Sequence, residues 1–268
     1  MPNTTPPPTK TTEAPAPEEG WRPDLGALRA RLDDIDDKIH DLLMDRAHVV
    51  EGVARTGKAA AFRPGREASI LRRLLSRHTG ALPARTLVRM WRELLAGTTA
   101  MQTQVTVSVT DSGAIAALAR EHFGFLTPIV VEPSVTAALA AVRTGAASIA
   151  VLPFPFTPST WAALTTGEPR LYITARLPFW TARPDHVPSG DALVVTASAP
   201  DASGIDRSFL ALTKTPDRAR LADAGLTMTA AHGTVAEVEG LVTEDDPNLP
   251  EGAIVLGGYA VPVAGETA

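Results

Sequence analysis

The sequence contains no cysteine. This absence excludes disulfide bonds, thiolate nucleophiles and cysteine zinc sites together, and it is compatible with a reducing compartment. The histidines are scattered along the chain without the spacing of metal ligands, so they favour surface or packing roles. We therefore expect no metal site and no thiol chemistry.

A long apolar run and a block of basic residues are also lacking. No apolar stretch approaches the ~20 residues that a membrane-spanning helix needs. The net charge of −5 and the pI of about 5.7 argue against a nucleic-acid or anionic-membrane partner. Residues 1–22 are rich in proline and threonine and lack the apolar core of a signal peptide, which predicts a disordered tail and a cytoplasmic protein.

What is present suits a soluble globular protein of two domains, since 268 residues are 44% hydrophobic and 21% charged. Residues 23–104 carry helical apolar stripes throughout. After residue 104, the β-rich runs "VTVSV", "PIVVEP" and "ASIAVLPF" alternate with the alanine-rich helices "GAIAALAREHFG" and "VTAALAAVRTG". A proline-rich stretch to about Pro188 follows, and then five probable strands with little helix between them: "DALVVTA", "RSFLALT", "LTMTAA", "AEVEGLV" and "AIVLGGYAV". We predict an all-α domain over 23–104 and an α/β to α+β region over 105–268, with the boundary near residues 102–106.

The first predicted helix begins near Leu25 and carries a continuous apolar stripe. Its members are spaced three and four apart: Leu25, Leu28, Leu32, Ile35, Ile39, Leu42, Val49 and Val53. About thirty residues of helix would be ~45 Å long, which exceeds the diameter of so small a domain. A coiled-coil-like helix of this length usually packs against another subunit, so the stripe predicts a homodimer.

Arg46 interrupts this stripe where an aliphatic side chain is expected. A buried guanidinium needs an anion and hydrogen-bond acceptors, so the position indicates either a carboxylate partner or an anionic ligand. From Arg46 alone, a structural ion pair or a side chain that extends out of the stripe is favoured over a ligand, because long side chains leave such stripes easily. More polar residues on buried faces are needed to favour a ligand.

The next two helices supply such residues. Arg66 and Glu67 stand at the start of the second helix, in "RPGREASILRRLLSRHTG". Thr98 and Gln102 continue the apolar stripe of the third helix, in "PARTLVRMWRELLAGTTAMQTQ". Several polar residues on the inner faces of one small bundle indicate a polar cavity, and this set suits a compact anion that also carries a hydroxyl.

Three segments are informative together: "LRARLDDIDDKIHDLLMDR", "FRPGREASILRRL" and "RELLAGTTAMQ". They resemble the all-helical chorismate mutases, isomerases that rearrange chorismate to prephenate on the route to phenylalanine and tyrosine. The resemblance covers about residues 25–104 and implies a three-helix domain that forms an intertwined dimer. It further implies that Arg29, Arg46 and Arg66 bind the substrate carboxylates and neighbouring polar atoms, while Thr98 helps to position the substrate.

The resemblance also implies the catalytic residues. Glu67 would accept the ring hydroxyl, and Gln102 would donate to the ether oxygen of chorismate. Where the family has a lysine, this chain has Gly57, so we assign the corresponding ether-oxygen role to the adjacent Lys58. A Claisen rearrangement requires a folded substrate and stabilised charge on the ether oxygen, but no nucleophile or proton transfer. No cofactor is expected.

In the second half, the segments "SGAIAALAREHFG" and "AVRTGAASIAVLPF" are followed by "GLTMTAAHG", "AEVEGLV" and "VLGGYAV". The first two weakly resemble a shortened prephenate dehydratase domain, and the last three resemble a regulatory ACT module. The dehydratase family has a Thr-Arg-Phe motif with a catalytic threonine, but Arg207, Ser208 and Phe209 stand there in this chain. We expect a degenerate region without dehydratase activity that either binds an aromatic amino acid effector or only supports the dimer.

Three functions remain in view. The first is a chorismate mutase with a non-catalytic C-terminal region. The second is a bifunctional chorismate mutase/prephenate dehydratase, which the loss of the motif threonine disfavours. The third is a non-catalytic sensor of aromatic metabolites, which Gly57 at the lysine position favours.

Overall fold

The structure is a computed structural model that describes residues 24–56, 62–111, 113–184, 187 and 189–265. The chain divides into two compact units, residues 1–49 and 50–268. In the described part of the chain, no helix combines the length and the hydropathy that crossing a membrane requires.

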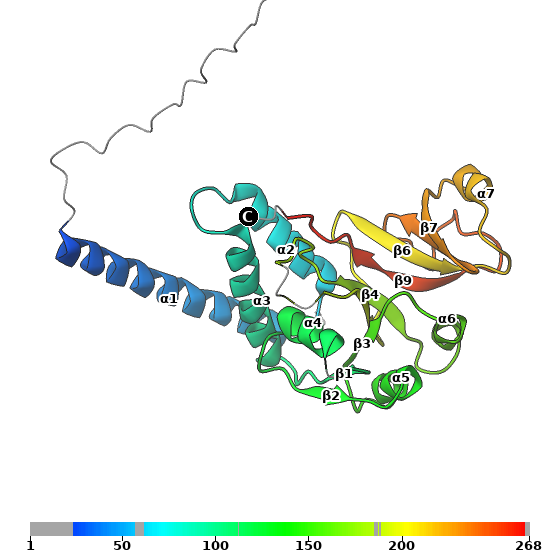
Figure 1. Ribbon diagram of the computed structural model, residues 1–268, viewed down its shortest axis with the longest axis horizontal. Helices are drawn as coiled ribbons and strands as arrows, with labels where there is room; N and C mark the ends of the chain where they lie inside the picture. Colours follow the sequence, from blue (N-terminus) through cyan, green and yellow to red (C-terminus); the bar gives the residue numbers. More distant parts are fainter. Residues whose placement is uncertain (1–23, 57–61, 112, 185–186, 188, 266–268) are drawn as a thin grey trace, which may run out of the picture. The chain divides into compact units, whose positions relative to one another are not determined.

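Helix α1 (Leu25–Arg55) has the extent that its apolar stripe predicted (Figure 1). None of its residues is buried. The exposed fraction of the stripe residues reaches 66% at Leu42 and 64% at Val49. Arg46 is half-buried, and this burial lowers the pKa of its guanidinium. The stripe therefore has no full apolar cover among the described residues of a single chain.

The second unit contains helices α2 (Pro64–Arg77) and α3 (Ala84–Ala100) and a nine-stranded mixed sheet. The strands are β1 (Val107–Val109), β2 (Ile129–Val131), β3 (Ile149–Pro153), β4 (Tyr172–Leu177), β5 (Ala192–Thr196), β6 (Asp206–Ala211), β7 (Met228–His232), β8 (Val235–Glu239) and β9 (Ile254–Ala260). Their order in the sheet is β2-β1-β3-β5-β4-β9-β6-β8-β7. Strand β1 is parallel to β2 and β3, whereas β5 is antiparallel to β3 and β4. Helices followed by a mixed α/β sheet are the predicted fold class.

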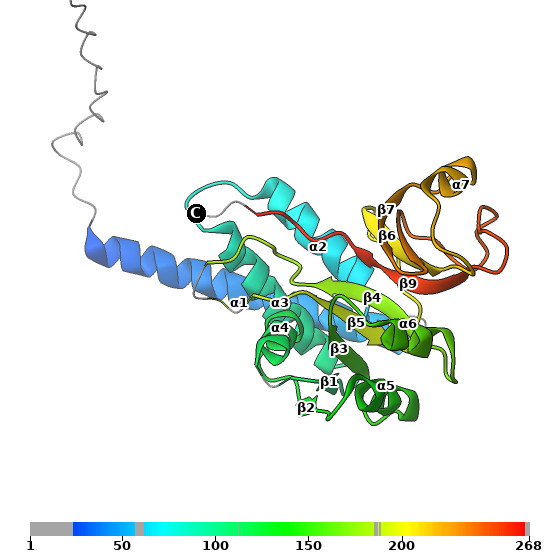
Figure 2. The same cartoon turned by 45° about the vertical axis from the view of Figure 1, so that its right-hand side comes forward.

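Strands β1, β3 and β5 are covered on both faces, whereas the edge strand β2 is partly exposed. Helix α4 (Ala114–Phe123) packs its Leu118 against one face, in a cluster with Val109 and Val151. Helices α5 (Val135–Thr144) and α6 (Pro158–Thr165) cover the other face, where Leu139 joins Leu152. Figures 1 and 2 show α4 and α5 on opposite sides of β1 and β3. Because successive strand residues point to opposite faces, strands buried on both sides are mostly apolar, as β3 and β5 are.

The last four strands form a smaller antiparallel half of the sheet. The chain order β6, α7 (Arg218–Asp223), β7, β8, β9 and the spatial order β9-β6-β8-β7 are those of a ferredoxin-like unit. Such a unit has a second helix before its last strand, but residues 240–253, all of them described, contain no helix here. This unit lies in the part of the chain that weakly resembles a regulatory ACT module.

One glycine joins the two halves of the sheet. Strands β4 and β9 are parallel and pair at Ile173 and Gly257. Gly257 has a φ of +108°, and a Cβ built on it would lie 2.2 Å from the Ile173 carbonyl oxygen. Only glycine lets two backbones approach so closely in this conformation.

We expect Gly257→Ala to destabilise the protein by at least about 2 kcal/mol more than Gly240→Ala does, because a backbone atom cannot move aside as a side chain can. Gly240 is the matched control: its φ is +84°, but nothing lies within 4 Å of the added Cβ. Urea denaturation of the two variants measures the difference. Equal losses would mean that the close approach of β4 to β9 is not a constraint.

The sequence missed strand β4. Its residues lie in the proline-rich stretch that ends near Pro188, where the sequence predicted no strand. The strand fits between Pro169 and Pro178, so neither ring removes a backbone donor from the ladder. The predicted strands β1, β2, β3 and β5 to β9 and the predicted helices α1 to α5 are confirmed.

Candidate functional site

The start of helix α2, which carries two of the candidate residues, is fixed by a distant carboxylate. Asp201 accepts hydrogen bonds from the backbone N–H groups of Gly65 (2.9 Å) and Arg66 (3.1 Å) and lies 3.2 Å from the guanidinium of Arg63. An acceptor at the first turn satisfies donors that have no partner within the helix and complements its dipole. Asp201 thus does the work of an N-cap, although it comes from the loop before β6. The side chain of Arg66 remains exposed.

Glu67 is buried in an ion pair. One of its oxygens lies 2.9 Å from Nη1 of Arg92 on α3, and the side chains of Glu67 and Arg92 are only 11% and 5% exposed. The same Nη1 lies 3.4 Å from Nε2 of His122 on α4. The guanidinium carbon of Arg92 also lies 4.9 Å from the centroid of the Phe179 ring. Three helices therefore meet at one buried carboxylate, one buried cation and one buried imidazole.

The ionisation of this trio follows from its burial. Desolvation raises the pKa of Glu67 to about 7, although the charge of Arg92 pulls it down; the Asp201 charge adds to the rise. Desolvation and the Arg92 charge hold the pKa of His122 well below its usual value, so this imidazole is neutral near pH 7. A neutral Nε2 without a proton can accept from Arg92. Near neutral pH the trio therefore has one group, Glu67, that is poised to change charge.

Glu67 lines a cavity of about 560 Å³ between α3 and α4. The other polar groups in its lining include Glu93, Thr99, Thr103 and His122. Thr98 is buried, and its hydroxyl donates to the carbonyl oxygens of Leu94 (2.9 Å) and Leu95 (3.1 Å) within its own helix. Gln102 Nε2 donates to the Thr98 carbonyl oxygen at 3.2 Å.

The remaining candidates lie elsewhere in the chain. Arg29 and Arg46 are on α1, seventeen residues apart, which is ~25 Å along a straight helix. Lys58 and Gly57 lie outside the described residues. Within the second unit, the structure thus brings Glu67 to Arg92, and Thr98 to Gln102. The substrate roles assigned to the seven candidates stay predictions.

Arg92 and His122 were missed by the sequence interpretation. The buried residues of α3 are Val88, Arg92, Leu95 and Thr98, with spacings of four, three and three, so Arg92 lies on the same row as the candidate Thr98. His122 occupies the corresponding place on α4, seven residues after Ile115. A search for charged residues on every alternative helical row would have found Arg92, because Glu67 supplies the complementary charge.

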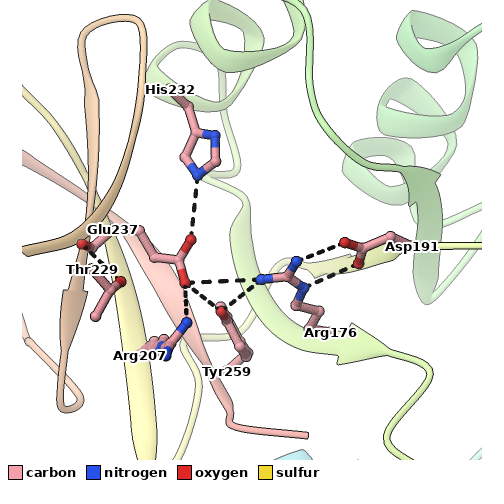
Figure 3. A network of polar contacts seen from close by, with 7 residues as sticks. All are labelled: Arg176, Asp191, Arg207, Thr229, His232, Glu237 and Tyr259. Atoms are coloured by element: carbon pink, nitrogen blue, oxygen red, sulfur yellow. Dashed lines mark hydrogen bonds and ion pairs between the residues drawn. The ribbon is translucent and has the colours of Figure 1, made fainter. Parts of the chain in front are cut away.

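A second polar network lies in the C-terminal half of the sheet (Figure 3). Its centre is the carboxylate of Glu237 on β8, whose side chain is 3% exposed. The groups around it are Tyr259 Oη at 2.6 Å, Arg207 Nη1 at 3.1 Å, His232 Nε2 at 3.3 Å and Arg176 Nη1 at 3.9 Å. Arg176 also forms a two-pronged ion pair with Asp191, at 3.0 and 2.6 Å. Hydrogen bonds from these partners outweigh desolvation and lower the pKa of Glu237.

Arg207 belongs to this network, and Ser208 and Phe209 follow it at the positions that correspond to the Thr-Arg-Phe motif of the dehydratases. Arg207 is paired with Glu237. Ser208 is completely buried, and its hydroxyl donates to the Gly240 carbonyl oxygen (2.9 Å) and accepts from the Val242 N–H (2.8 Å). A hydroxyl engaged on both sides by backbone is a structural group. Phe209 is buried in the apolar core beside it.

The fold and the buried groups define a class of protein. In this class, a helical segment with an internal carboxylate-arginine pair is joined to a mixed α/β sheet with a ferredoxin-like end. Residues 28–103 match the family model of chorismate mutase type II. The helical segment is thus a chorismate mutase domain of this type, as its three quoted segments predicted.

Curated relatives extend this result. The bifunctional chorismate mutase/prephenate dehydratase of Stutzerimonas stutzeri is 32% identical over 110 residues, which are 37% of this chain and 30% of that protein. The protein of the same description from Pseudomonas aeruginosa is 29% identical over 139 residues, 48% of this chain and 38% of that protein. The alignments therefore span only about a third of the length of these relatives.

Solved structures resemble the chain at a lower level. A prephenate dehydratase from Arthrobacter aurescens, in complex with L-Phe, has a TM-score of 0.43 and 14% identity, covering 61% of this chain and 93% of that one. A protein described as a quorum-quenching acylase, GqqA, has the same TM-score at 19% identity, covering 59% of this chain and 95% of that one. Likeness of this size supports no functional argument.

Proposed function

We propose that this protein is a chorismate mutase, an isomerase that converts chorismate to prephenate in phenylalanine and tyrosine biosynthesis. The observation that carries the proposal is the family match over residues 28–103, which includes the three helices with the candidate residues. The C-terminal region is proposed to have lost catalytic activity and to support the helical domain.

In this proposal, arginines hold the substrate and fixed donors stabilise the transition state. Arg29, Arg46 and Arg66 bind the two carboxylates, because a guanidinium fork fixes a carboxylate by two parallel hydrogen bonds. Thr98 helps to position the substrate. Glu67 accepts the ring hydroxyl, and Lys58 and Gln102 donate to the ether oxygen as negative charge grows on it. Such preorganised donors lower the barrier without any covalent step or cofactor.

The active form is proposed to be a homodimer in the cytoplasm. The exposed stripe of α1 supports this assembly, since a second copy of the same helix would bury its apolar side chains. Each site would then combine residues of both subunits. An aromatic amino acid effector of the ACT-like half remains part of the proposal, as does the prediction that neither nucleic acid nor a membrane is a partner.

A bifunctional mutase/dehydratase is the second candidate, favoured by the description of the curated relatives. The internal hydrogen bonds of Ser208 and the ion pair of Arg207 speak against it. The third candidate, a non-catalytic sensor, would use the same pocket without turnover.

One assay separates the three functions. We expect the purified protein to consume chorismate and to accumulate prephenate, with no enzymatic formation of phenylpyruvate at neutral pH. Arg46→Ala should lower mutase turnover by about 10²-fold or more, the scale for losing one preorganised charged donor. Chorismate, prephenate and phenylpyruvate are followed by chromatography of the same reaction.

Arg31→Ala is the matched control, because Arg31 is an exposed arginine of the same helix without an assigned role. Sustained release of phenylpyruvate would favour the bifunctional enzyme, and chorismate binding without turnover would favour the sensor. Unchanged turnover in Arg46→Ala would overturn the assignment of the site.

A further inference from the structure

A second cavity lies on the other side of the buried Arg92. It has a volume of about 550 Å³ and is bounded by α3, α4 and the segment Pro178–Arg183; we call it the arginine cavity. Helices α3 and α4 lie side by side in both views (Figures 1 and 2). None of the candidate residues for chorismate lines this cavity, so it is distinct from the site proposed above.

The lining carries an excess of positive charge. It contains five arginines and two glutamates: Arg85, Arg89, Arg92, Arg120, Arg183, Glu93 and Glu121. Glu121 is already engaged by both terminal nitrogens of Arg183, at 3.0 and 2.6 Å, and Glu93 accepts from the Phe125 backbone N–H. Arg85 and Arg89 are exposed, one helical turn apart, and have no ion pair within the described part of the chain. Two neighbouring guanidinium groups suit a carboxylate.

The rest of the lining is apolar. Val88, Leu118, Phe125, Phe179 and Trp180 contribute side chains to it. Phe179 is 6% exposed and forms part of the core shared by α2, α3 and β9. A concave, mostly apolar cavity with a few convergent charged groups is the usual form of a small-molecule site. The chemistry therefore selects an organic acid with an aromatic or branched body over inorganic phosphate, which lacks the apolar part.

Arg92 connects this cavity to the candidate catalytic residue. Its guanidinium lines the arginine cavity, while Glu67, 2.9 Å from Nη1, lines the cavity between α3 and α4. His122 lines both cavities. A carboxylate entering the arginine cavity would compete with Glu67 for the same cation. Glu67 would then hold its proton more firmly and accept a hydrogen bond less well.

We propose that the arginine cavity binds a small monocarboxylic acid with an aromatic or branched apolar body, and that this ligand inhibits the mutase by drawing Arg92 away from Glu67. The binding stands on the cavity alone, whereas the inhibition rests on the proposed function. Because linkage is reciprocal, occupation of the mutase site should weaken the binding of this acid by the same factor.

Phenylacetate is a suitable probe, with phenylacetamide as the uncharged analogue and inorganic phosphate as the anion without an apolar body. We expect calorimetric titration of the full-length protein to detect phenylacetate and neither analogue. The double variant Arg85→Ala/Arg89→Ala should weaken phenylacetate binding by about tenfold or more, since it removes the two positive charges that have no ion-pair partner among the described residues. The control Arg73→Ala/Arg77→Ala changes two exposed arginines of α2 that do not line the cavity and should bind phenylacetate as the wild type does.

The coupling is measured as mutase turnover with and without phenylacetate. We expect inhibition of the wild type and, in Arg85→Ala/Arg89→Ala, unchanged basal turnover with resistance to the acid. A competitor at the chorismate site would inhibit both proteins equally, which would overturn the coupling. Tight binding of phenylacetamide, or wild-type affinity in the double variant, would overturn the cavity as an acid site. Absence of turnover in every protein would refute the proposed function, while the titration would still decide the binding.

Discussion

Mixing two inactive variants, Arg29→Ala and Arg46→Ala, is expected to restore about a quarter of the wild-type mutase activity. The two arginines stand seventeen residues apart on one continuous helix, ~25 Å along its axis, so one molecule of chorismate cannot contact both from the same copy. Antiparallel pairing of two α1 helices would bring Arg29 of one subunit to Arg46 of the other. Each homodimeric variant then lacks one arginine in both sites and should be nearly inactive.

The expected recovery follows from symmetry. In a mixed dimer, one site regains both arginines and the other loses both. Random subunit exchange makes about half of the dimers mixed, and half of their sites are complete, which gives about a quarter of the activity. Mass spectrometry of differently tagged subunits verifies the exchange. Mixing Arg31→Ala with Arg46→Ala is the control. Because Arg31 has no assigned role in the site, each mixed dimer should keep one active site, namely the site that contains the intact Arg46 of the Arg31→Ala subunit.

Two results would contradict the shared site. Persistent inactivity despite complete exchange would mean that Arg29 and Arg46 do not meet across the dimer. Full activity of Arg29→Ala alone would mean that Arg29 is a surface residue of α1. Both are distinguishable from a folding defect, because circular dichroism reports the helix content of each variant directly.

Much of the fold was predictable because the local patterns are strong. Helix α1 has one uninterrupted apolar stripe, and strands such as β3 and β5 are apolar runs of ordinary strand length. Strand β4 was not predicted because it lies between two prolines and its six residues alternate only partly between apolar and polar. The deciding information there was tertiary, since β4 becomes a strand by pairing with β5 on one side and β9 on the other.

The candidate site was less predictable for a related reason. Glu67 was found from the sequence, but its partner Arg92 was not singled out, because a charged residue on a helix is usually exposed. In the structure Arg92 is buried. The capping of α2 by Asp201 joins residues that are 135 and 136 positions apart. No local signal reports such a contact. The residue types of the candidate site were therefore easier to predict than the contacts by which distant segments hold these residues in place.

The contacts of α2 also show what the C-terminal region does for the helical segment. Gly65 lies so close to the Asp201 carbonyl oxygen that an added Cβ would be 2.1 Å away from it. Arg72 donates to Ser203 Oγ (2.8 Å) and to the Val261 carbonyl oxygen (2.6 Å), at the far end of the chain. Helix α2, with Arg66 and Glu67 in its first turn, is thus positioned by the sheet region. If the C-terminal region has no catalysis of its own, as proposed above, these contacts alone give a reason for its retention.

The second large effect is expected from Arg92→Met, which keeps the apolar stem and removes the charge. Breaking one side of a buried ion pair typically costs about 3–5 kcal/mol, because the remaining charge stays buried without compensation. Glu67 would be that charge. We expect the free energy of unfolding of the variant to fall by this order at pH 8.

The loss should be smaller at pH 6. The pKa of Glu67 in the folded protein, about 7, is raised above its ordinary value of 4.5, so the stability it contributes is full at low pH and is lost as the pH rises through 7. Without Arg92 this pKa rises further, and the stability of the variant keeps falling above pH 7 where that of the wild type levels off. The Asp201 charge acts in the same direction. His122, relieved of the Arg92 charge, can accept a proton at low pH more readily, which also favours the variant there.

Urea denaturation of wild type, Arg92→Met and Glu67→Gln/Arg92→Met at pH 6 and pH 8 tests this prediction. The double variant has no buried carboxylate at position 67, so at pH 8 its free energy of unfolding should fall less below that of the wild type than the value for Arg92→Met does. At pH 6 the two variants should have nearly the same free energy of unfolding. A loss in Arg92→Met that is equal at both pH values would show that Glu67 does not titrate in this range. Wild-type stability of Arg92→Met at pH 8 would show that the ion pair between α2 and α3 does not hold Glu67 in place.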